Sequence, residues 1–230
     1  MLQKYWQGVV DLIFPPICYA CGQYEPLKDL LLCHPCNETL PWIDHSGVAK
    51  AALEGKEHFP VDIEDINSLL FFTKNSKTQK LIQEIKYHGQ RRLAVFLGEL
   101  VGQKLKLEKD HSNSILVPVP IHHKRLRERG YNQAYEIAKG IQSSTEIPIE
   151  NDILIRATFE GSQTAKNKYQ RAKILDAAFT YNSLTKVNRN TNIILIDDVI
   201  TTGATIRSCS NQLRKAGFKN IEVACLAISI

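Results

Sequence analysis

The sequence predicts an α/β fold with a mostly parallel sheet, helices on both faces of the sheet, and a small cysteine-rich module in front of it. Three observations lead to this expectation. Aliphatic strands alternate with helical segments after residue 65, four of the six cysteines crowd into residues 18–36, and the composition changes between these parts. Strands that are aliphatic throughout are typical of parallel sheets covered on both sides. We therefore expect a cysteine module over residues 1–45 and an α/β domain over residues 46–230.

The expected strands and helices follow one another with the spacing of an α/β domain. A linker of mixed polar and small residues ends near Asp65, and continuous aliphatic runs then predict buried strands. The helical segments carry apolar residues on one side, and Asn132 occupies an N-cap position. The expected strands are residues 66–72, 114–119, 192–196 and 221–230, and the expected helices are residues 76–88, 92–107, 132–142 and 205–216.

Length and composition exclude several classes of protein. The chain has 230 residues, of which 43% are hydrophobic, so it can bury one sizeable core with a small appendage. Its net charge of +5 suits phosphate-bearing ligands or nucleic acid and is too small for a polybasic protein. The apolar run at residues 9–14 contains Asp11 and ends at Pro15-Pro16, which makes it too short to span a bilayer. We expect a cytoplasmic protein without a membrane span.

The most informative pattern is a buried strand that leads into an acidic pair and a threonine-rich turn, over residues 193–205. Ligands of open α/β sheets bind at the carboxyl ends of the strands. Backbone N–H groups of such a turn, together with the first turn of the following helix, can surround a phosphate. The residues expected to hold it are Thr201, Thr202, Gly203, Ala204 and Thr205.

The acidic pair, Asp197 and Asp198, needs a different role because two carboxylates repel a phosphate. They can accept hydrogen bonds from vicinal sugar hydroxyls, or hold magnesium through water. A sugar 5-phosphate with a free vicinal diol satisfies both the pair and the turn. An isolated acidic pair at a strand end is usually just solvated, but the whole string of residues 193–205 argues against that alternative.

A basic segment follows the strand at residues 114–119 and forms a candidate second anion site. The cations that follow this strand end also suit DNA, and a solvated basic loop is the alternative that their spacing leaves open. The neighbouring His122 and His123 are typical of a solvated turn. The candidate anion-binding residues, expected on a loop that ends at Gly130, are Lys124, Arg125, Arg127 and Arg129.

Four cysteines near the N-terminus have the spacing of a structural zinc site. Two Cys-x-x-Cys pairs, separated by residues 22–32, can turn four thiolates toward one tetrahedral ion in a zinc-ribbon-like module. A redox dithiol and paired disulfides are the alternatives, and the absence of a secretion signal favours zinc over both. A closed four-sulfur site leaves no open position for catalysis, so we expect a structural role. The expected ligands are Cys18, Cys21, Cys33 and Cys36.

Residues 193–205 resemble the signature of type I phosphoribosyltransferases, which has four hydrophobic residues, an acidic pair, two hydrophobic residues and a threonine-rich glycine turn. The resemblance implies that Asp197 and Asp198 contact the ribose of phosphoribosyl pyrophosphate and act in catalysis, and that residues 201–205 hold its 5-phosphate. It also implies that the basic segment faces the pyrophosphate, which is bound with magnesium.

The four-cysteine head joined to this domain resembles the ComF family of competence proteins, which is implicated in DNA uptake during natural transformation. The resemblance covers nearly the whole chain. It implies single-stranded DNA and the competence machinery, including a helicase-like protein, as partners, and a loop between Arg156 and Arg171 that closes over the ligand. The chain departs from the family pattern at two points: Ile174 stands after Arg171 where an asparagine is common, and the usual leucine a few residues after the loop glutamine is absent. Further strings that carry the resemblance are residues 85–89, 117–120 and 129–133, and Arg156 followed by Gln163, Arg171 and Ala178-Phe179.

Two functions are compatible with these features. The first is a ComF-like protein that binds phosphoribosyl pyrophosphate with magnesium and also single-stranded DNA. The alternative is an active phosphoribosyltransferase that transfers the phosphoribosyl group to an unknown nitrogen nucleophile and releases pyrophosphate. In purine-type members of the resembled class, an acidic residue that can act as a general base lies at the position of Thr201. Because this chain has a threonine there, we do not expect a hypoxanthine-like acceptor.

Overall fold

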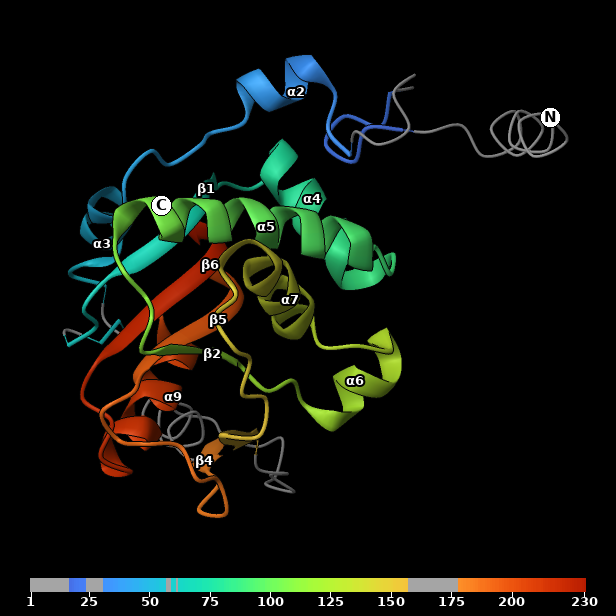
Figure 1. Cartoon of the computed structure of the whole chain (residues 1–230). Coiled ribbons are helices and arrows are strands. Elements are labelled where there is room, and N and C mark those ends of the chain that lie inside the picture. The colour runs from blue at the N-terminus through green and yellow to red at the C-terminus, as the bar shows by residue number, and fades with distance from the viewer. Residues whose placement is uncertain (1–16, 24–30, 57–58, 61, 157–177) are drawn as a thin grey trace, which may run out of the picture.

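The computed structural model describes residues 17–23, 31–56, 59–60, 62–156 and 178–230, and is built around a parallel sheet (Figure 1). The strand order of this sheet is β1-β6-β5-β2, and every neighbouring pair is parallel. The expected α/β class with a parallel sheet is therefore confirmed. The four strands are β1 (Ile66–Phe72), β2 (Ser114–Pro118), β5 (Asn192–Ile200) and β6 (Ile221–Ser229).

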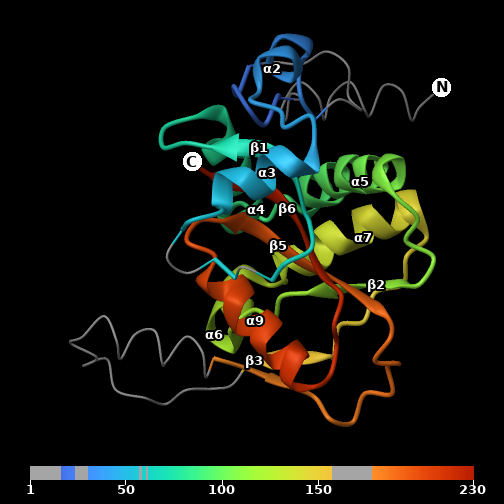
Figure 2. The ribbon, with the colours of Figure 1, turned by 90° about the vertical axis from the view of Figure 1, so that its left-hand side faces the viewer.

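Helices cover both faces of the sheet, as expected (Figures 1 and 2). Ile194 and Ile196 of β5 pack toward one face, and Ile193 and Leu195 pack toward the other. Successive side chains of a strand point to opposite faces, so a strand that is covered twice is aliphatic at every position. One face carries α4 (Lys77–Tyr87), α5 (Arg91–Glu108) and α7 (Gln133–Thr145), and the other carries α3 (Ser46–Leu53) and α9 (Ala204–Lys215).

Five elements differ from the sequence-based expectation. The basic segment expected to be a loop forms the short helix α6 (His123–Arg129), which begins with His122 accepting a hydrogen bond from the N–H of Lys124 and ends at Gly130 with φ 77°. The expected linker contains α3. Strand β5 continues to Ile200 because its last residues still pair with β6. A small antiparallel pair, β3 (Leu154–Arg156) and β4 (Phe179–Tyr181), was not expected.

The cysteine-containing segment packs directly against the α/β core. Leu31 and Leu40 lie in one buried cluster with Leu81 and Ile85 of α4. After the short helix α2 (His34–Thr39), the chain runs beside β1, where the N–H of Ile43 donates to the carbonyl of Leu69 at 2.8 Å. The domain boundary at residue 45 stays a prediction, because a shared buried cluster neither requires nor excludes separate folding. Within the described residues, no helix has both the length and the apolar character needed to cross a bilayer.

Helices α5 and α7 approach each other so closely that glycine is required at their crossing. A Cβ atom on Gly98 would overlap the backbone carbonyl of Ile137. On the facing helix, a Cβ atom on Gly140 would overlap the carbonyl oxygen of Val95 and lie 2.7 Å from the backbone nitrogen of Glu99. These neighbours are backbone atoms, which cannot move aside as a side chain can. The crossing therefore fixes α7 against α5.

We predict that Gly140→Ala lowers the free energy of unfolding by about 1–3 kcal/mol or more, because an added methyl group must push two helix backbones apart. Gly47→Ala, at an exposed position of helix α3, is the matched control, since a Cβ atom there meets nothing within 4 Å. The control should change stability by less than about 1 kcal/mol, in the stabilising direction. Urea unfolding of both variants measures the difference, and equal effects would contradict the tight crossing.

Candidate functional site

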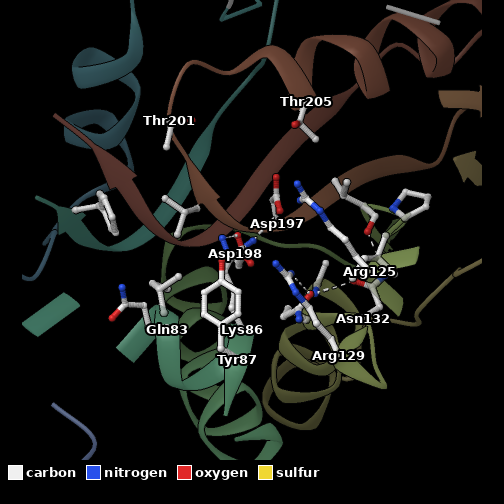
Figure 3. A pocket seen from close by; sticks show the side chains of 18 of the residues that line it. Gln83, Lys86, Tyr87, Arg125, Arg129, Asn132, Asp197, Asp198, Thr201 and Thr205 are labelled. Atoms are coloured by element: carbon white, nitrogen blue, oxygen red, sulfur yellow. Dashed lines mark hydrogen bonds and ion pairs between the residues drawn. The ribbon is translucent and has the colours of Figure 1, made fainter. Parts of the chain in front are cut away.

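A cavity of about 430 Å³ lies at the carboxyl ends of the parallel strands (Figure 3). Its walls come from the ends of β1, β2 and β5, and from α4, α6 and α7. Figure 3 shows Asp197 and Asp198 at the centre, with Arg125 and Arg129 extending toward them from one side. Of the residues expected from the sequence, the cavity brings together Asp197, Asp198, Thr201, Thr205, Arg125 and Arg129.

The acidic pair is held within β5, three residues before the strand ends. The Oδ1 atom of Asp197 accepts a hydrogen bond from the N–H of Asp198 at 2.8 Å, and the Oδ1 atom of Asp198 lies 2.9 Å from the Nζ atom of Lys86. Removal from bulk water and the nearby charge of Asp198 raise the pKa of Asp197 to about 7. Asp197 therefore loses its proton close to neutral pH.

The threonine-rich turn places backbone donors beside the acidic pair. Helix α9 begins after Gly203, whose φ is 79° and which has no side chain with which to cap the helix. The N–H of Ala204 makes a long hydrogen bond to the Oγ1 atom of Thr202, at 3.4 Å. A Cβ atom on Gly203 would lie 2.7 Å from the Cδ2 atom of Phe59, so glycine is needed both for the left-handed backbone and for this contact. Thr201 and Thr202 are exposed. A hollow of about 30 Å³ opens here, lined by Asp197 and residues 199–206.

The helical form of α6 divides the four basic candidates between two faces. Arg125 and Arg129 are four residues apart, lie on one side of the helix and line the cavity. Lys124 and Arg127 are exposed and do not line it. The Nη1 atom of Arg129 donates to the Oε1 atom of Gln133 at 3.1 Å, which orients its guanidinium. The sequence pattern alone could not separate these pairs, because it did not predict a helix here.

Besides Gln79, Gln83 and Tyr87, four polar residues that were not expected as site residues line the cavity. Arg156, at the end of β3, is largely buried with its guanidinium carbon 5.0 Å from the ring centroid of Phe179, and burial lowers its pKa. Gln133 is 3% exposed, and its Nε2 atom has no hydrogen-bond partner among the described residues. Arg156 and Lys86 lie in strings that carry the family resemblance, but nothing in their local spacing points to the acidic pair. The four residues are Lys86, Asn132, Gln133 and Arg156.

This arrangement places complementary charges around one space. Helix α9 offers the positive end of its dipole and its first N–H groups. Arg125, Arg129 and Arg156 offer cations, and the acidic pair lies between the helix and these arginines. A ligand that carries two separated anionic groups and a polar group between them would match all three. The expected mobile loop between Arg156 and Arg171 lies outside the described residues except for Arg156 itself.

The four N-terminal cysteines also come together. Their Sγ atoms all lie within 4.8 Å of one another, and those of Cys21 and Cys33 are 3.8 Å apart. A tetrahedral zinc ion with Zn–S bonds of about 2.3 Å places its sulfur ligands about 3.8 Å apart, so the cluster fits a metal ion such as zinc. The six cysteines are free thiols, and Cys209 and Cys225 are buried in the core of the α/β part.

Two solved structures have a limited similarity to this chain. One is the allosteric regulatory enzyme of purine biosynthesis, with a TM-score of 0.43 and 20% identity over 63% of this chain and 30% of that chain. Another is adenine phosphoribosyl transferase from Trypanosoma brucei, with a TM-score of 0.34 and 11% identity over 70% of this chain and 84% of that chain. Similarity at this level does not establish a shared activity.

Curated relatives identify the chain more directly, although no family model matches it. It is 33% identical to competence protein F of Haemophilus influenzae in an alignment 155 positions long, which covers 64% of this chain and 66% of that protein. It is 29% identical to competence protein ComFC of Bacillus subtilis, over 64% of this chain and 57% of that protein. The match thus spans slightly less than two thirds of these relatives. The chain is thus a relative of the ComF competence proteins.

Proposed function

We propose that the chain binds phosphoribosyl pyrophosphate with magnesium in the cavity and acts in the handling of DNA during uptake. The observation that carries the first part is the position of the acidic pair, which lies between a helix N-terminus and a group of arginines in one cavity. Phosphoribosyl pyrophosphate carries a phosphate at one end, a pyrophosphate at the other and a vicinal diol between them. Its functional groups therefore match the three parts of the site.

In this proposal, each part of the cavity has its own role. The N–H groups at the start of α9, with Thr201, Thr202 and Thr205, bind the 5-phosphate. Asp197 and Asp198 accept hydrogen bonds from the ribose hydroxyls. Arg125, Arg129 and Arg156 bind the pyrophosphate. Magnesium supplies positive charge that offsets the repulsion between the carboxylates and the pyrophosphate, and the acidic pair would hold it through water.

The same site could transfer the phosphoribosyl group, which is the alternative function. Departure of pyrophosphate from C1 of the ribose places negative charge on the leaving group, where the arginines would stabilise it. Thr201 has no acidic group with which to take a proton from a purine acceptor, so an acceptor of that type is not favoured. Release of pyrophosphate that requires both magnesium and the acidic pair would distinguish turnover from binding alone.

The DNA part of the proposal rests on the relatives and on the outer face of α6. The relatives include competence proteins and, at 24% identity over 64% of this chain, the DNA utilization protein YhgH of Escherichia coli. Lys124 and Arg127 are exposed on α6, where they can reach the phosphates of single-stranded DNA. We propose single-stranded DNA, and a helicase-like protein of the competence machinery, as partners in the cytoplasm.

We also propose that Cys18, Cys21, Cys33 and Cys36 hold a structural zinc ion. The cluster supports this because Cys18, Cys33 and Cys36 pack into the same buried group of residues as α4. A metal there would fix a segment with few apolar residues of its own against the core. No open coordination position remains for catalysis.

The acidic pair should make ligand binding depend on magnesium. We predict that an Asp197→Asn, Asp198→Asn variant loses about tenfold or more in affinity for phosphoribosyl pyrophosphate when magnesium is present, because charged hydrogen-bond acceptors are replaced by neutral ones. Calorimetric titration with and without magnesium measures this change. Asp152→Asn is the control, since Asp152 is exposed and does not line the cavity. Equal affinity and equal magnesium dependence in all three proteins would contradict the role of the pair.

The raised pKa of Asp197, about 7, should appear in the pH dependence of binding. A carboxyl group with this pKa is about one tenth ionised at pH 6 and about nine tenths ionised at pH 8. Since the proposed role uses the ionised form, affinity for the magnesium complex should rise about tenfold as the pH increases across this interval. Asp197→Asn should keep only the pH dependence of the ligand's own phosphates. An unchanged pH profile in this variant would refute the assignment.

Zinc should be bound at one ion per chain and should stabilise the fold. Cys36→Ser is predicted to lower the zinc content and the unfolding temperature, because one of four ligands is removed. The control is Cys225→Ala, which changes a buried cysteine of β6 outside the cluster and should keep a full equivalent of zinc. Elemental analysis and thermal unfolding of the purified proteins check both outcomes. Full zinc content in Cys36→Ser would argue against the site.

A further inference from the structure

A second hollow of about 510 Å³ adjoins the main cavity. The two spaces have four lining residues in common, Lys86, Tyr87, Arg125 and Arg129. A ligand bound in the main cavity can therefore extend into the hollow without leaving the protein surface. Because the main cavity by itself already offers a place for each group of phosphoribosyl pyrophosphate, the hollow is additional space which that ligand does not need.

The lining of this hollow combines cations with an exposed aromatic ring. Among its described residues are three cations, Lys86, Arg125 and Arg129, and one carboxylate, Glu128. Tyr87 is 67% exposed even though the guanidinium carbon of Arg129 lies 5.4 Å from its ring centroid. A tyrosine this exposed contributes little to the core. Cations that follow a phosphate backbone, next to an aromatic ring on which a base can stack, are typical of sites for single-stranded nucleic acid.

The threonine-rich turn limits which part of such a strand can enter the main cavity. The hollow at the turn, of about 30 Å³, is too small for a sugar or a base. Behind it, Phe59 lies so close to Gly203 that even an added Cβ atom would overlap it, which leaves no room for the chain of a ligand to continue past the turn. A phosphate bound there is consequently a terminal one. An internal stretch of a strand, with chain on both sides of each phosphate, would not reach these N–H groups.

We propose that the cavity and the adjoining hollow together bind the 5′-phosphorylated end of a single strand of DNA. The terminal phosphate lies at the turn of residues 201–205, the next phosphate lies among Lys86, Arg125 and Arg129, and a base stacks on Tyr87. Magnesium held by the acidic pair would offset the repulsion between these carboxylates and the strand. The inference rests on the proposed function, because both use the same phosphate turn.

The preference for a 5′-phosphate can be tested with three oligonucleotides of ten thymidines that carry an internal fluorescein. One has a 5′-phosphate, the second has a 3′-phosphate and the third has neither. The second matches the first in charge, so it controls for general electrostatic attraction. In fluorescence anisotropy with the full chain and magnesium, the 5′-phosphorylated strand should bind about tenfold more tightly than the other two, and phosphoribosyl pyrophosphate should displace it.

Variants at Tyr87 test the stacking contact. Tyr87→Ala should lose about tenfold in affinity for the 5′-phosphorylated strand, whereas Tyr87→Phe should retain it because the ring remains. Tyr135→Ala is the matched control. Tyr135 is also an exposed tyrosine beside a cation, with the Nζ atom of Lys139 5.7 Å from its ring centroid, and it lines neither space. This variant should bind as the wild type does.

Two results would overturn the inference. One is equal affinity of the wild type for the 5′- and 3′-phosphorylated strands, and the other is an equal loss in Tyr87→Ala and Tyr135→Ala. If the wild type shows no end preference but still binds phosphoribosyl pyrophosphate with magnesium, the end-binding inference fails and the proposed function stands. If it binds neither that ligand nor the 5′-phosphorylated strand, both fail.

Discussion

Two adjacent carboxylates held inside a parallel sheet are the constraint on which the rest of the site depends. Asp197 lies in the part of β5 that pairs with β6, so strand pairing fixes the backbone of the acidic pair and keeps it from moving into solvent. Holding two like charges away from water is unfavourable, and here the unfavourable interaction is reduced by the ion pair of Lys86 with Asp198 and by the raised pKa of Asp197, about 7. Carboxyl groups whose pKa is raised by burial and by a neighbouring charge are characteristic of binding and catalytic sites.

Helix α4 connects the acidic pair to the cysteine cluster. Its apolar residues Leu81 and Ile85 pack in the same buried cluster as Cys33 and Cys36, whereas Lys86 on the same helix reaches Asp198. The Nζ atom of Lys77 donates to the Oγ1 atom of Thr39 at 2.9 Å, a second contact between α4 and the cysteine-containing segment. Packing of that segment therefore bears directly on the position of one cavity wall.

The sequence predicts the parts of this structure that depend on local pattern. Residues 193–205 identify both the strand and the turn because the aliphatic run, the acidic pair and Gly203 are contiguous, and two Cys-x-x-Cys pairs identify the cluster. The role of Lys86 could not be predicted, because its contact with Asp198 joins residues 112 positions apart and exists only after α4 packs on the sheet. Helix α6 was missed because it is short and has no buried residues, so no apolar periodicity marks it.

A crystal structure with phosphoribosyl pyrophosphate and magnesium tests the central claim most directly. The account predicts the 5-phosphate at the N–H groups of residues 201–205, and the ribose hydroxyls within hydrogen-bonding distance of Asp197 and Asp198. Arg125 and Arg129 should contact the pyrophosphate. A ligand that binds elsewhere on the chain, or in this cavity with its sugar turned away from the two carboxylates, would contradict it.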